Sequence, residues 1–319
     1  MKDCFGREIS YMRISVTDRC NLRCKYCMPA EGIEDFGHEN ILSFENIERI
    51  VRASSQLGIT KFRITGGEPL ARRGIANLIE ILAKIKGVEE LAMTTNGTML
   101  NKHAEALKKA GLDRVNISLD TLVHTKYAEI TRGGDLDDVI AGINAAIKVG
   151  LMPVKINVVA IAGFNDDEII DFVQLTYNHQ VDIRFIELMP IGHAQLDGGY
   201  KFMSSEDIKK RLPNLIHIEN QSGVADNYKY PDALGKIGFI SPMSNNFCGI
   251  CNKIRLTSDG KLKPCLHSNQ EIDLNQVLRT GDEEALKEVI KTAILNKEER
   301  HHLNEGVKPI TRDMYKIGG

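Results

Sequence analysis

The chain alternates between short apolar runs and longer amphipathic stretches from about Tyr11 to Pro190. Short apolar runs bounded by turn residues indicate buried strands, whereas apolar residues that recur every three or four positions indicate helices. The predicted strands are residues 11–16, 61–65, 90–95, 113–119, 153–160 and 182–188. The predicted helices between them are residues 44–57, 75–85, 102–110, 136–149 and 166–178. This alternation predicts an α/β fold with a parallel sheet and helices on its outside.

Polar and glycine-rich motifs lie at the carboxyl ends of these predicted strands. They are residues 65–69 (Thr-Gly-Gly-Glu-Pro), 94–97 (Thr-Thr-Asn-Gly), 118–120 (Ser-Leu-Asp) and 187–190 (Glu-Leu-Met-Pro). In a parallel α/β barrel, the active site assembles at this rim. We therefore expect a barrel rather than an open Rossmann sheet, and six units predict an incomplete barrel. The sequence Gly-x-Gly-x-x-Gly follows none of these strands, which disfavours a Rossmann nucleotide site.

The regular alternation ends after about Tyr200. Residues 202–212 have a helical pattern, short strands and glycines follow, and residues 283–295 form a late amphipathic pattern. We expect a soft boundary near residue 225. The predicted domains are residues 1–225, which hold the barrel, and residues 226–319, a C-terminal extension.

Composition narrows the class of protein only a little. Of 319 residues, 42% are hydrophobic and 26% are charged, as in ordinary globular domains. The formal net charge of −2 gives no global positive field, so we expect no nucleic-acid polymer as a partner. Residues 1–10 lack a signal-peptide core, and the most apolar stretch, residues 151–164, is interrupted by Lys155 and Asn157. Because that stretch is too short to span a bilayer, we expect a cytoplasmic protein without membrane contact.

Cys20, Cys24 and Cys27 form the spacing Cys-x3-Cys-x2-Cys. Cysteine thiolates are the usual ligands of iron–sulfur clusters, and four are needed to fill every iron of a cubane. Three close ligands would hold three irons and leave the fourth iron open for a small molecule. A zinc site is the alternative, but structural zinc normally takes four ligands, and no fourth Cys or His lies within reach in the sequence.

A second set of three cysteines, Cys248, Cys251 and Cys265, has the spacing Cys-x2-Cys-x13-Cys. It favours a second cluster with an open iron. Zinc with His267 as the fourth ligand is the alternative. The seven cysteines group as three and three, with Cys4 left over, and this grouping does not indicate a disulfide framework.

The first cysteine set, with Tyr26 before its last cysteine and Gly66-Gly67-Glu68-Pro69 downstream, resembles the radical S-adenosylmethionine (SAM) family. The resemblance implies an incomplete (β/α)6 TIM-type barrel that binds a [4Fe–4S] cluster and SAM. In this family an electron from the cluster cleaves SAM to a 5′-deoxyadenosyl radical, which abstracts a hydrogen atom from the substrate. The Gly-Gly-Glu-Pro segment is implied to receive the ammonium group of SAM. By itself, the tetrapeptide also fits a generic tight turn between a strand and a helix.

Further features resemble the branch of this family that cyclises GTP for molybdenum cofactor biosynthesis. They are residues 13–24, Arg72-Arg73, the second three-cysteine site and the terminal Gly318-Gly319. The resemblance implies a second [4Fe–4S] cluster, which binds the purine through its open iron. It implies SAM contacts at Tyr26, Gly67, Ser118 and Met189, and GTP contacts at Arg13, Arg63, Thr94, Lys155, Lys253, Ile254 and Arg255. The branch usually has arginine at the position of Lys253, and lysine lacks the planar two-donor fork of arginine.

The same resemblance implies that Gly318 and Gly319 reach the active site and assist product formation. The alternative is a frayed end, which is what most terminal glycines are. The pair His301-His302 is expected on the surface, because adjacent residues of a helix do not face one site.

The implied activity is the radical conversion of GTP to 3′,8-cyclo-7,8-dihydro-GTP. The implied partners are GTP, an external electron donor and a downstream pterin-forming enzyme, and a homodimer is one option. Two rival classes stay open: a peptide-modifying radical SAM enzyme with an auxiliary cluster, and a non-enzymatic iron–sulfur or zinc regulatory protein. The second rival leaves the motifs at the strand ends unexplained.

Overall fold

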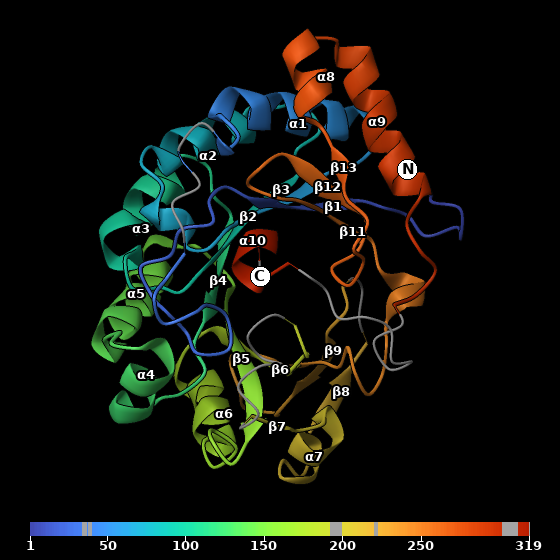
Figure 1. Ribbon diagram of the computed structural model, residues 1–319. Helices are drawn as coiled ribbons and strands as arrows, with labels where there is room; N and C mark the ends of the chain where they lie inside the picture. Colours follow the sequence, from blue (N-terminus) through green and yellow to red (C-terminus); the bar gives the residue numbers. More distant parts are fainter. Residues whose placement is uncertain (34–36, 38–39, 192–199, 220–222, 302–311, 319) are drawn as a thin grey trace.

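The computed structural model describes residues 1–319 except 34–36, 38–39, 192–199, 220–222, 302–311 and 319. Within these residues, eight neighbouring strands run parallel in the order β11-β1-β2-β3-β4-β5-β6-β10. They curve around the centre of the molecule in Figure 1. Their bounds are β11 Lys253–Leu256, β1 Tyr11–Ser15, β2 Lys61–Thr65, β3 Glu90–Thr95, β4 Arg114–Ser118, β5 Val154–Ala162, β6 Val181–Glu187 and β10 Ile237–Ile240.

Antiparallel strands extend both edges of this sheet. β12 (Lys261–Lys263) and β13 (Ile272–Asp273) continue it beyond β11, and β9 (Asp226–Lys229) and β8 (Ile216–Ile218) continue it beyond β10. A short β7 (Lys201–Phe202) pairs with β5. In the described part of the chain β11 and β10 do not pair with each other, so the barrel is incomplete. The α/β partial barrel expected from the sequence is therefore confirmed.

Helices cover the outside of the parallel strands (Figure 1). Ser43 Oγ accepts a hydrogen bond from the Asn46 N–H (3.2 Å) and thereby satisfies a free donor at the start of α1. Gly150 ends α5 with a φ of 77°, a left-handed conformation that glycine adopts without strain. The helices are α1 Phe44–Gln56, α2 Ile75–Ala83, α3 Leu100–Lys109, α4 His124–Thr131, α5 Leu136–Val149, α6 Ile169–Asn178, α7 Ser205–Lys210, α8 Asn275–Thr280, α9 Glu283–Leu295 and α10 Met314–Ile317.

The six predicted strands are confirmed to within two residues at each end. The prediction of a helix over residues 202–212 is wrong at its start. Phe202 belongs to β7 and pairs with Ile161 of β5, and the helix begins after its cap, Ser204. The sequence pattern missed α4, α8 and α10. The boundary near residue 225 stays a prediction; β10 and β11, which follow it in sequence, join the same sheet as β1 and β6.

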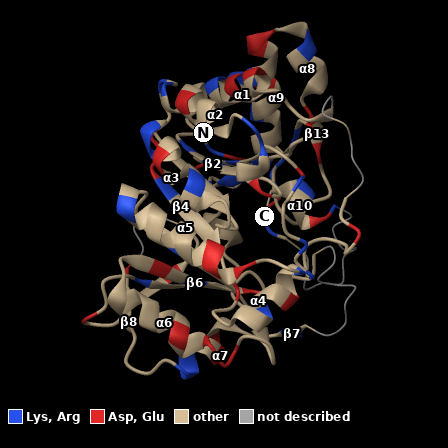
Figure 2. Cartoon of the chain, turned by 90° about the vertical axis from the view of Figure 1, so that its left-hand side faces the viewer, with Lys and Arg blue, Asp and Glu red and all other residues tan. Residues whose placement is uncertain are grey.

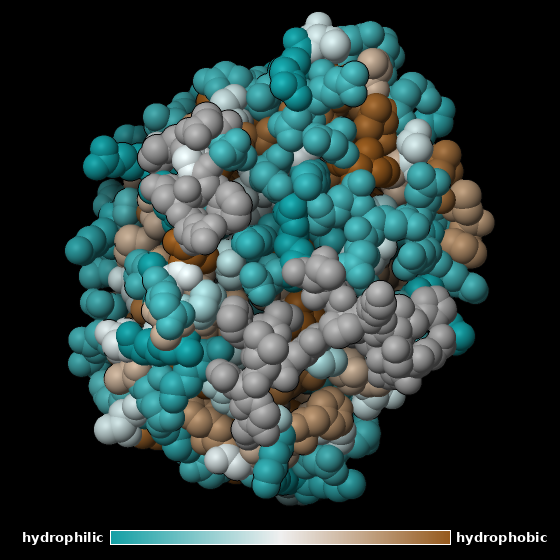
Figure 3. All heavy atoms as spheres, in the orientation of Figure 1, coloured by the Kyte–Doolittle hydropathy of each residue, from teal (hydrophilic) through white to brown (hydrophobic). Residues whose placement is uncertain are grey.

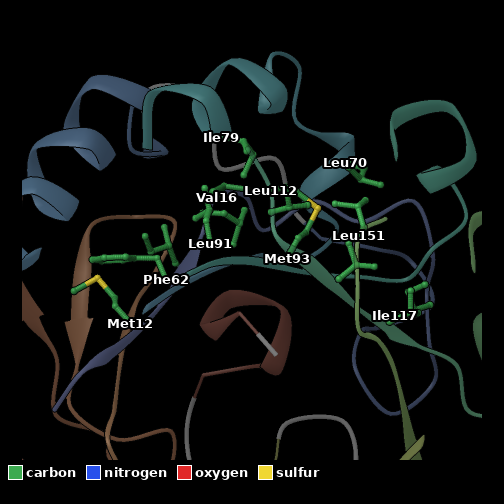
Figure 4. Close-up of a cluster of buried hydrophobic side chains, with 14 of the residues drawn as sticks. Met12, Val16, Phe62, Leu70, Ile79, Leu91, Met93, Leu112, Ile117 and Leu151 are labelled. Carbon is green, nitrogen blue, oxygen red and sulfur yellow. The ribbon is translucent and has the colours of Figure 1, made fainter. Parts of the chain in front are cut away.

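The hydrophobic core lies between the strands and their covering helices. Met12, Ile14 and Phe62 are fully buried there, and the intervening strand residues face the other way. Burying one such side chain contributes about 1.5–3 kcal/mol. Figure 4 shows Met12, Phe62 and Ile79 on this outer side of the strands, whereas α10 lies on the inner side. The inner side is therefore free for a functional site.

The outer surface is polar and of mixed charge. Figure 2 shows Lys/Arg and Asp/Glu residues interspersed over the helices in that view, and Figure 3 shows a mainly hydrophilic face with smaller hydrophobic patches. Among the described residues, every helix is too short or too polar to cross a membrane.

Candidate active site

The inner face of the barrel gathers basic side chains from neighbouring strands. The register places Arg13 beside both Arg63 and Arg255. We call the inward-facing basic residues the basic layer; they are Arg13, Arg63, Arg114, Lys155, Arg184, Lys253 and Arg255. Burial, reinforced by repulsion within this layer, lowers the pKa of Lys155 to about 8 and that of Arg63 to about 9. Such a concentration of buried cations favours an anionic ligand.

A cavity of about 350 Å³ lies at the carboxyl ends of the strands. It is lined by both cysteine sets, by the strand-end motifs and by part of the basic layer. The expected gathering of these motifs at one rim is confirmed. The lining residues that the sequence had pointed to are Arg13, Cys20, Cys24, Tyr26, Cys27, Gly67, Thr94, Ser118, Met189, Cys248, Cys251, Lys253, Arg255 and Cys265.

Cys20, Cys24 and Cys27 lie in a loop that follows β1, and all three are free thiols at the cavity. Burial raises the pKa of Cys24 well above its ordinary value and that of Cys27 to about 12. A bound metal would replace the protons of these thiols. Arg132, on α4's C-terminal cap, donates to the carbonyl of Met28 (2.8 Å) and so holds the end of the loop.

The backbone of Gly66 and Gly67 packs against the chain that leads into the cysteine loop. A Cβ on Gly67 would lie 2.3 Å from the Arg19 carbonyl oxygen, and one on Gly66 would lie 2.6 Å from that of Thr17. The Gly67 N–H donates to the Thr17 carbonyl (2.7 Å). Both positions therefore require glycine, whose backbone can approach another chain closely.

Glu68 does not face the cavity. Its Oε1 accepts from the Thr95 hydroxyl (2.8 Å) and the Leu70 N–H (3.0 Å), and its Oε2 accepts from the Asn96 N–H (2.7 Å). Burial raises the pKa of Glu68 to about 7, even though these bonds oppose the shift. Glu68 thus joins the end of β2 to the end of β3. What the segment offers a ligand is the backbone of Gly66 and Gly67.

Tyr26, which is half-buried, and the buried Asp120 form a pair at the rim. The Tyr26 hydroxyl donates to Asp120 Oδ2 (2.6 Å), and the Val159 N–H donates to Asp120 Oδ1 (2.9 Å). Burial raises the pKa of Asp120 to about 6. Ser118 and Met189 line the same cavity from the ends of β4 and β6. The four residues implied for SAM therefore share one cavity with the first cysteine set.

The second cysteine set is held by two buried cations from distant segments. Arg7 donates to the carbonyls of Cys248 (3.0 Å) and Glu299 (2.7 Å). Lys297, which is 2% exposed, donates to the carbonyls of Pro264 (2.7 Å) and Lys253 (3.0 Å). Burial raises the pKa of Cys251, but Lys297 and Lys253 outweigh it, so the pKa is lowered. The surroundings of this set are thus basic, whereas Glu68 and Asp120 lie near the first set.

His267, the fourth ligand of the zinc alternative, also lines the cavity. Its Nε2 lies 3.3 Å from Met189 Sδ, and its ring packs edge-on against His301 at 4.6 Å between centroids. Within the described residues, no three His, Cys, Asp or Glu side chains lie close enough to share one metal ion. Thiolates that bind different irons of a cluster do not need to converge on one point. Both three-thiol sets therefore fit the [4Fe–4S] expectation in donor type and number.

Unpaired polar atoms mark where a ligand fits. Thr94 Oγ1, Asn157 Oδ1 and Arg63 Nε are buried without a hydrogen-bond partner in the described part of the chain. Buried polar groups nearly always have a partner, so these atoms are suited to a bound polar molecule. Arg63 and Lys155 do not line the cavity itself; each precedes a lining residue, Thr65 or Asn157, by two positions on its strand. They therefore lie one layer deeper in the barrel.

The side chain of Ile254 lies in the hydrophobic core and is fully buried. It alternates with Lys253 and Arg255 along β11 and so faces the helices. A GTP contact at this position can therefore come only from the backbone of Ile254.

The C-terminal segment enters the barrel, so the alternative of a frayed end is wrong for residues 314–318. Tyr315 and Ile317 are buried in α10, which lies inside the ring of strands in Figure 1. Arg255 Nη1 donates to the Gly318 carbonyl (3.0 Å). Gly319 and His302 lie outside the described residues. His301 was expected on the surface and is instead buried, with its Nε2 3.1 Å from the Pro242 carbonyl.

Sequence reasoning missed several residues of the site. Asn157 and Arg184 are inward-facing members of two predicted strands, so the period of two along a strand could have identified them. Lys297 and His301 follow α9 and carried no pattern that pointed to the barrel.

Comparison with known proteins identifies the family. The model of the radical SAM superfamily matches residues 14–176, and that of the molybdenum cofactor synthesis C domain matches residues 181–303. A GTP 3′,8-cyclase of Alkaliphilus oremlandii (strain OhILAs) is 54% identical over 321 residues, which cover 100% of each chain. A GTP 3′,8-cyclase of Moorella thermoacetica (strain ATCC 39073 / JCM 9320) is 48% identical over 325 residues, again 100% of each chain.

Among solved structures, Streptococcus suis SuiB bound to S-adenosylmethionine has a TM-score of 0.62 and 18% sequence identity. The match covers 97% of this chain and 77% of SuiB, and at this identity it shows a shared fold. The full-length identity to the two cyclases is much higher. The chain therefore belongs to the radical SAM superfamily and, within it, to the GTP 3′,8-cyclase family.

Proposed function

We propose that the protein converts GTP to 3′,8-cyclo-7,8-dihydro-GTP, the first step of molybdenum cofactor biosynthesis. The observation that carries this proposal is a single cavity lined by both three-cysteine sets and by Arg13, Lys253 and Arg255. A triphosphate carries about four negative charges and is bound by Arg and Lys donors at close range. The basic layer supplies such donors between and below the two cysteine sets.

The residues divide into two groups around the substrate. Cys20, Cys24 and Cys27 would hold the first [4Fe–4S] cluster, and Cys248, Cys251 and Cys265 would hold the second. When bound, the first cluster would supply an electron to SAM, and the second would offer the purine an open coordination position. SAM would contact Tyr26, Gly67, Ser118 and Met189.

The basic layer orients GTP. Arg13, Lys253 and Arg255 reach the cavity, and Arg63 and Lys155 reinforce their charge from the layer below. Thr94 Oγ1 has a free hydrogen-bond capacity in the described structure that the nucleotide would satisfy. A nucleotide held there would occupy the cavity that both cysteine sets line. Hydrogen abstraction at C3′ and attack of the resulting radical on C8 then give the cyclised nucleotide after reduction and protonation.

The C-terminal segment forms part of the wall of the cavity. Met314 and Tyr315 line it, and Ile317 is fully buried against Ile191. These side chains exclude water, which protects a radical from side reactions. Gly318, with Gly319 beyond the described residues, is proposed to assist product formation rather than SAM cleavage.

The peptide-modifying alternative is weaker. SuiB shares the fold with this chain at 18% identity, and one SuiB structure is described as bound to precursor peptide SuiA. Fold likeness at this level does not transfer a substrate. The basic layer has more cations than acidic partners: Asp182 pairs with Lys155, and Glu90 pairs with Arg114. This excess of positive charge suits a polyphosphate better than a peptide. An external electron donor, a downstream pterin-forming enzyme, a homodimer and a cytoplasmic location remain predictions.

The test is anaerobic reconstitution with GTP, SAM and a reductant, followed by identification of the nucleotide product. We expect cyclised GTP from the wild-type chain, and 5′-deoxyadenosine without cyclised GTP from Cys251→Ser. Cys24→Ala should release no 5′-deoxyadenosine, because one of the three ligands of the first cluster is lost. Normal 5′-deoxyadenosine release by Cys24→Ala, or normal product from Cys251→Ser lacking the second cluster, would overturn the assignment.

A further inference from the structure

The C-terminal segment, residues 312–318, is held by ion pairs of its first residue, Arg312. Arg312 Nη1 and Nη2 each donate to one oxygen of Asp259 (2.9 and 2.8 Å), and Arg312 Nε pairs with Glu271 Oε1 (3.0 Å). The Arg312 side chain is 16% exposed. A guanidinium that binds one carboxylate through two parallel bonds is held in a defined orientation, and the second carboxylate strengthens this.

The two carboxylates belong to the antiparallel extension of the sheet. Asp259 lies in the turn between β11 and β12, and Glu271 directly precedes β13. Glu271 also pairs with Lys263 (3.3 Å), which is 1% exposed. Burial alone would raise the pKa of Asp259, but the bonds from Arg312 and Thr257 lower it to about 2. Asp259 is thus charged, and it lies in the hairpin whose first strand carries Lys253 and Arg255.

After Arg312, the segment makes three further contacts in the barrel. Ile317 packs with Ile191, Met189 and Leu266. The Tyr315 N–H is directed at the sulfur of Cys27. The Gly318 carbonyl accepts from Arg255 (3.0 Å). The segment therefore spans from the hairpin, past a ligand of the first cluster, to the basic layer.

The geometry points to Arg312 as a positioning residue, which fixes the C-terminal segment so that Gly318 stays against Arg255 at the cavity. The four-residue α10 is too short to be stable by itself. Its placement therefore depends on contacts at its two ends and on the packing of Ile317. This inference rests on the proposed function, because it assigns Arg312 to the cyclisation step.

Amide hydrogen exchange of residues 313–318 tests the placement without any cofactor. In the full-length protein, Arg312→Ala should lower the protection of these amides about tenfold or more, because a two-carboxylate ion pair is lost. Asp259→Asn should have a smaller effect in the same direction, because Arg312 keeps its pair with Glu271. The double variant should be no worse than Arg312→Ala, since that change already removes both ion pairs. Lys210→Ala is the control: it removes an exposed ion pair with Asp207 (3.1 Å) on α7 and should leave the segment protected.

The catalytic readout is the ratio of cyclised GTP to 5′-deoxyadenosine in the reconstituted enzyme. Arg312→Ala should lower this ratio about tenfold while SAM cleavage stays near the wild-type rate. Arg312→Lys keeps the charge but not the planar two-donor group of arginine. Its product ratio should fall between those of the wild type and Arg312→Ala. Wild-type protection and a wild-type ratio in Arg312→Ala would overturn the inference. So would equal losses of SAM cleavage and cyclisation, which indicate a general folding defect. If the wild-type protein itself forms no cyclised GTP, the proposed function fails, and the exchange experiment still decides whether Arg312 holds the segment.

Discussion

Arg255 donates from Nη1 to the backbone carbonyl of Gly318 at 3.0 Å. One buried member of the basic layer therefore contacts the C-terminal segment. Burial, with repulsion from Arg13, lowers the pKa of Arg255 to about 9. The guanidinium has five N–H donors, and the Gly318 carbonyl uses one of its two Nη groups. Arg255 can therefore bind a phosphate oxygen and the end of the chain together.

Replacing Arg255 by alanine should weaken the binding of GTP more than that of SAM. A charge-assisted hydrogen bond contributes roughly 1.5–3 kcal/mol, which corresponds to a tenfold or greater loss of apparent GTP affinity. Titrations of the reconstituted protein with each ligand measure the two effects. Equal losses for SAM and GTP would indicate a structural arginine instead.

Gly318 can be tested with a closely matched control. A Cβ on Gly318, whose φ is +77°, would lie 2.3 Å from Thr65 Oγ1, whereas a Cβ on Gly281, whose φ is +74°, meets nothing within 4 Å. Alanine at either position carries the same left-handed strain of about 1–2 kcal/mol. Only Gly318→Ala also displaces the C-terminal segment.

We therefore expect Gly318→Ala to lose most of its cyclised product while 5′-deoxyadenosine formation continues, and Gly281→Ala to form product normally. The experiment quantifies both products by chromatography. Product formation by Gly318→Ala at the rate of Gly281→Ala would mean that the segment has no part in the reaction.

GTP binding should weaken as the pH rises through about 8. The pKa of Lys155 is lowered to about 8 by burial and by the nearby Arg184 and Arg114. The charge of the protonated lysine favours GTP from the layer below the cavity. The dissociation constant should therefore be insensitive to Lys155 well below this pH and rise above it, by at most about tenfold per pH unit. Lys155→Arg stays charged throughout and should lack this step.

Lys253 also has a lowered pKa, so the comparison of the wild-type protein with Lys155→Arg isolates the contribution of Lys155. Calorimetric titrations with GTP between pH 7 and pH 9 provide the measurement. Parallel profiles for the two proteins would show that the charge of Lys155 does not contribute to nucleotide binding.

The fold was predictable where local pattern and tertiary structure agree. β2 and β3 match their predicted bounds because apolar outward residues such as Phe62 and Met93 alternate along them and turn residues end them. α10 was not predictable, because four residues carry no periodicity and the helix is stabilised by contacts made in the barrel.

The cluster-binding role of the cysteines was predictable, because sets of three closely spaced cysteines are typical ligands of an iron–sulfur cluster. The basic layer was only partly predictable: Arg184 and Arg114 alternate with apolar residues on strands, but single arginines on strands are usually paired or solvated. The burial of His301 depends on Pro242, which is 59 residues away in the chain. No local pattern could indicate that contact.

The central claim is that GTP lies with its ribose C3′ open to the radical derived from SAM. Reconstituted protein supplied with GTP deuterated at C3′ tests this claim, because the abstracted atom ends in 5′-deoxyadenosine. The account predicts 5′-deoxyadenosine that carries one deuterium, together with cyclised GTP, and no transfer from GTP deuterated at other ribose carbons. Unlabelled 5′-deoxyadenosine formed alongside cyclised GTP from the C3′-deuterated substrate would contradict it.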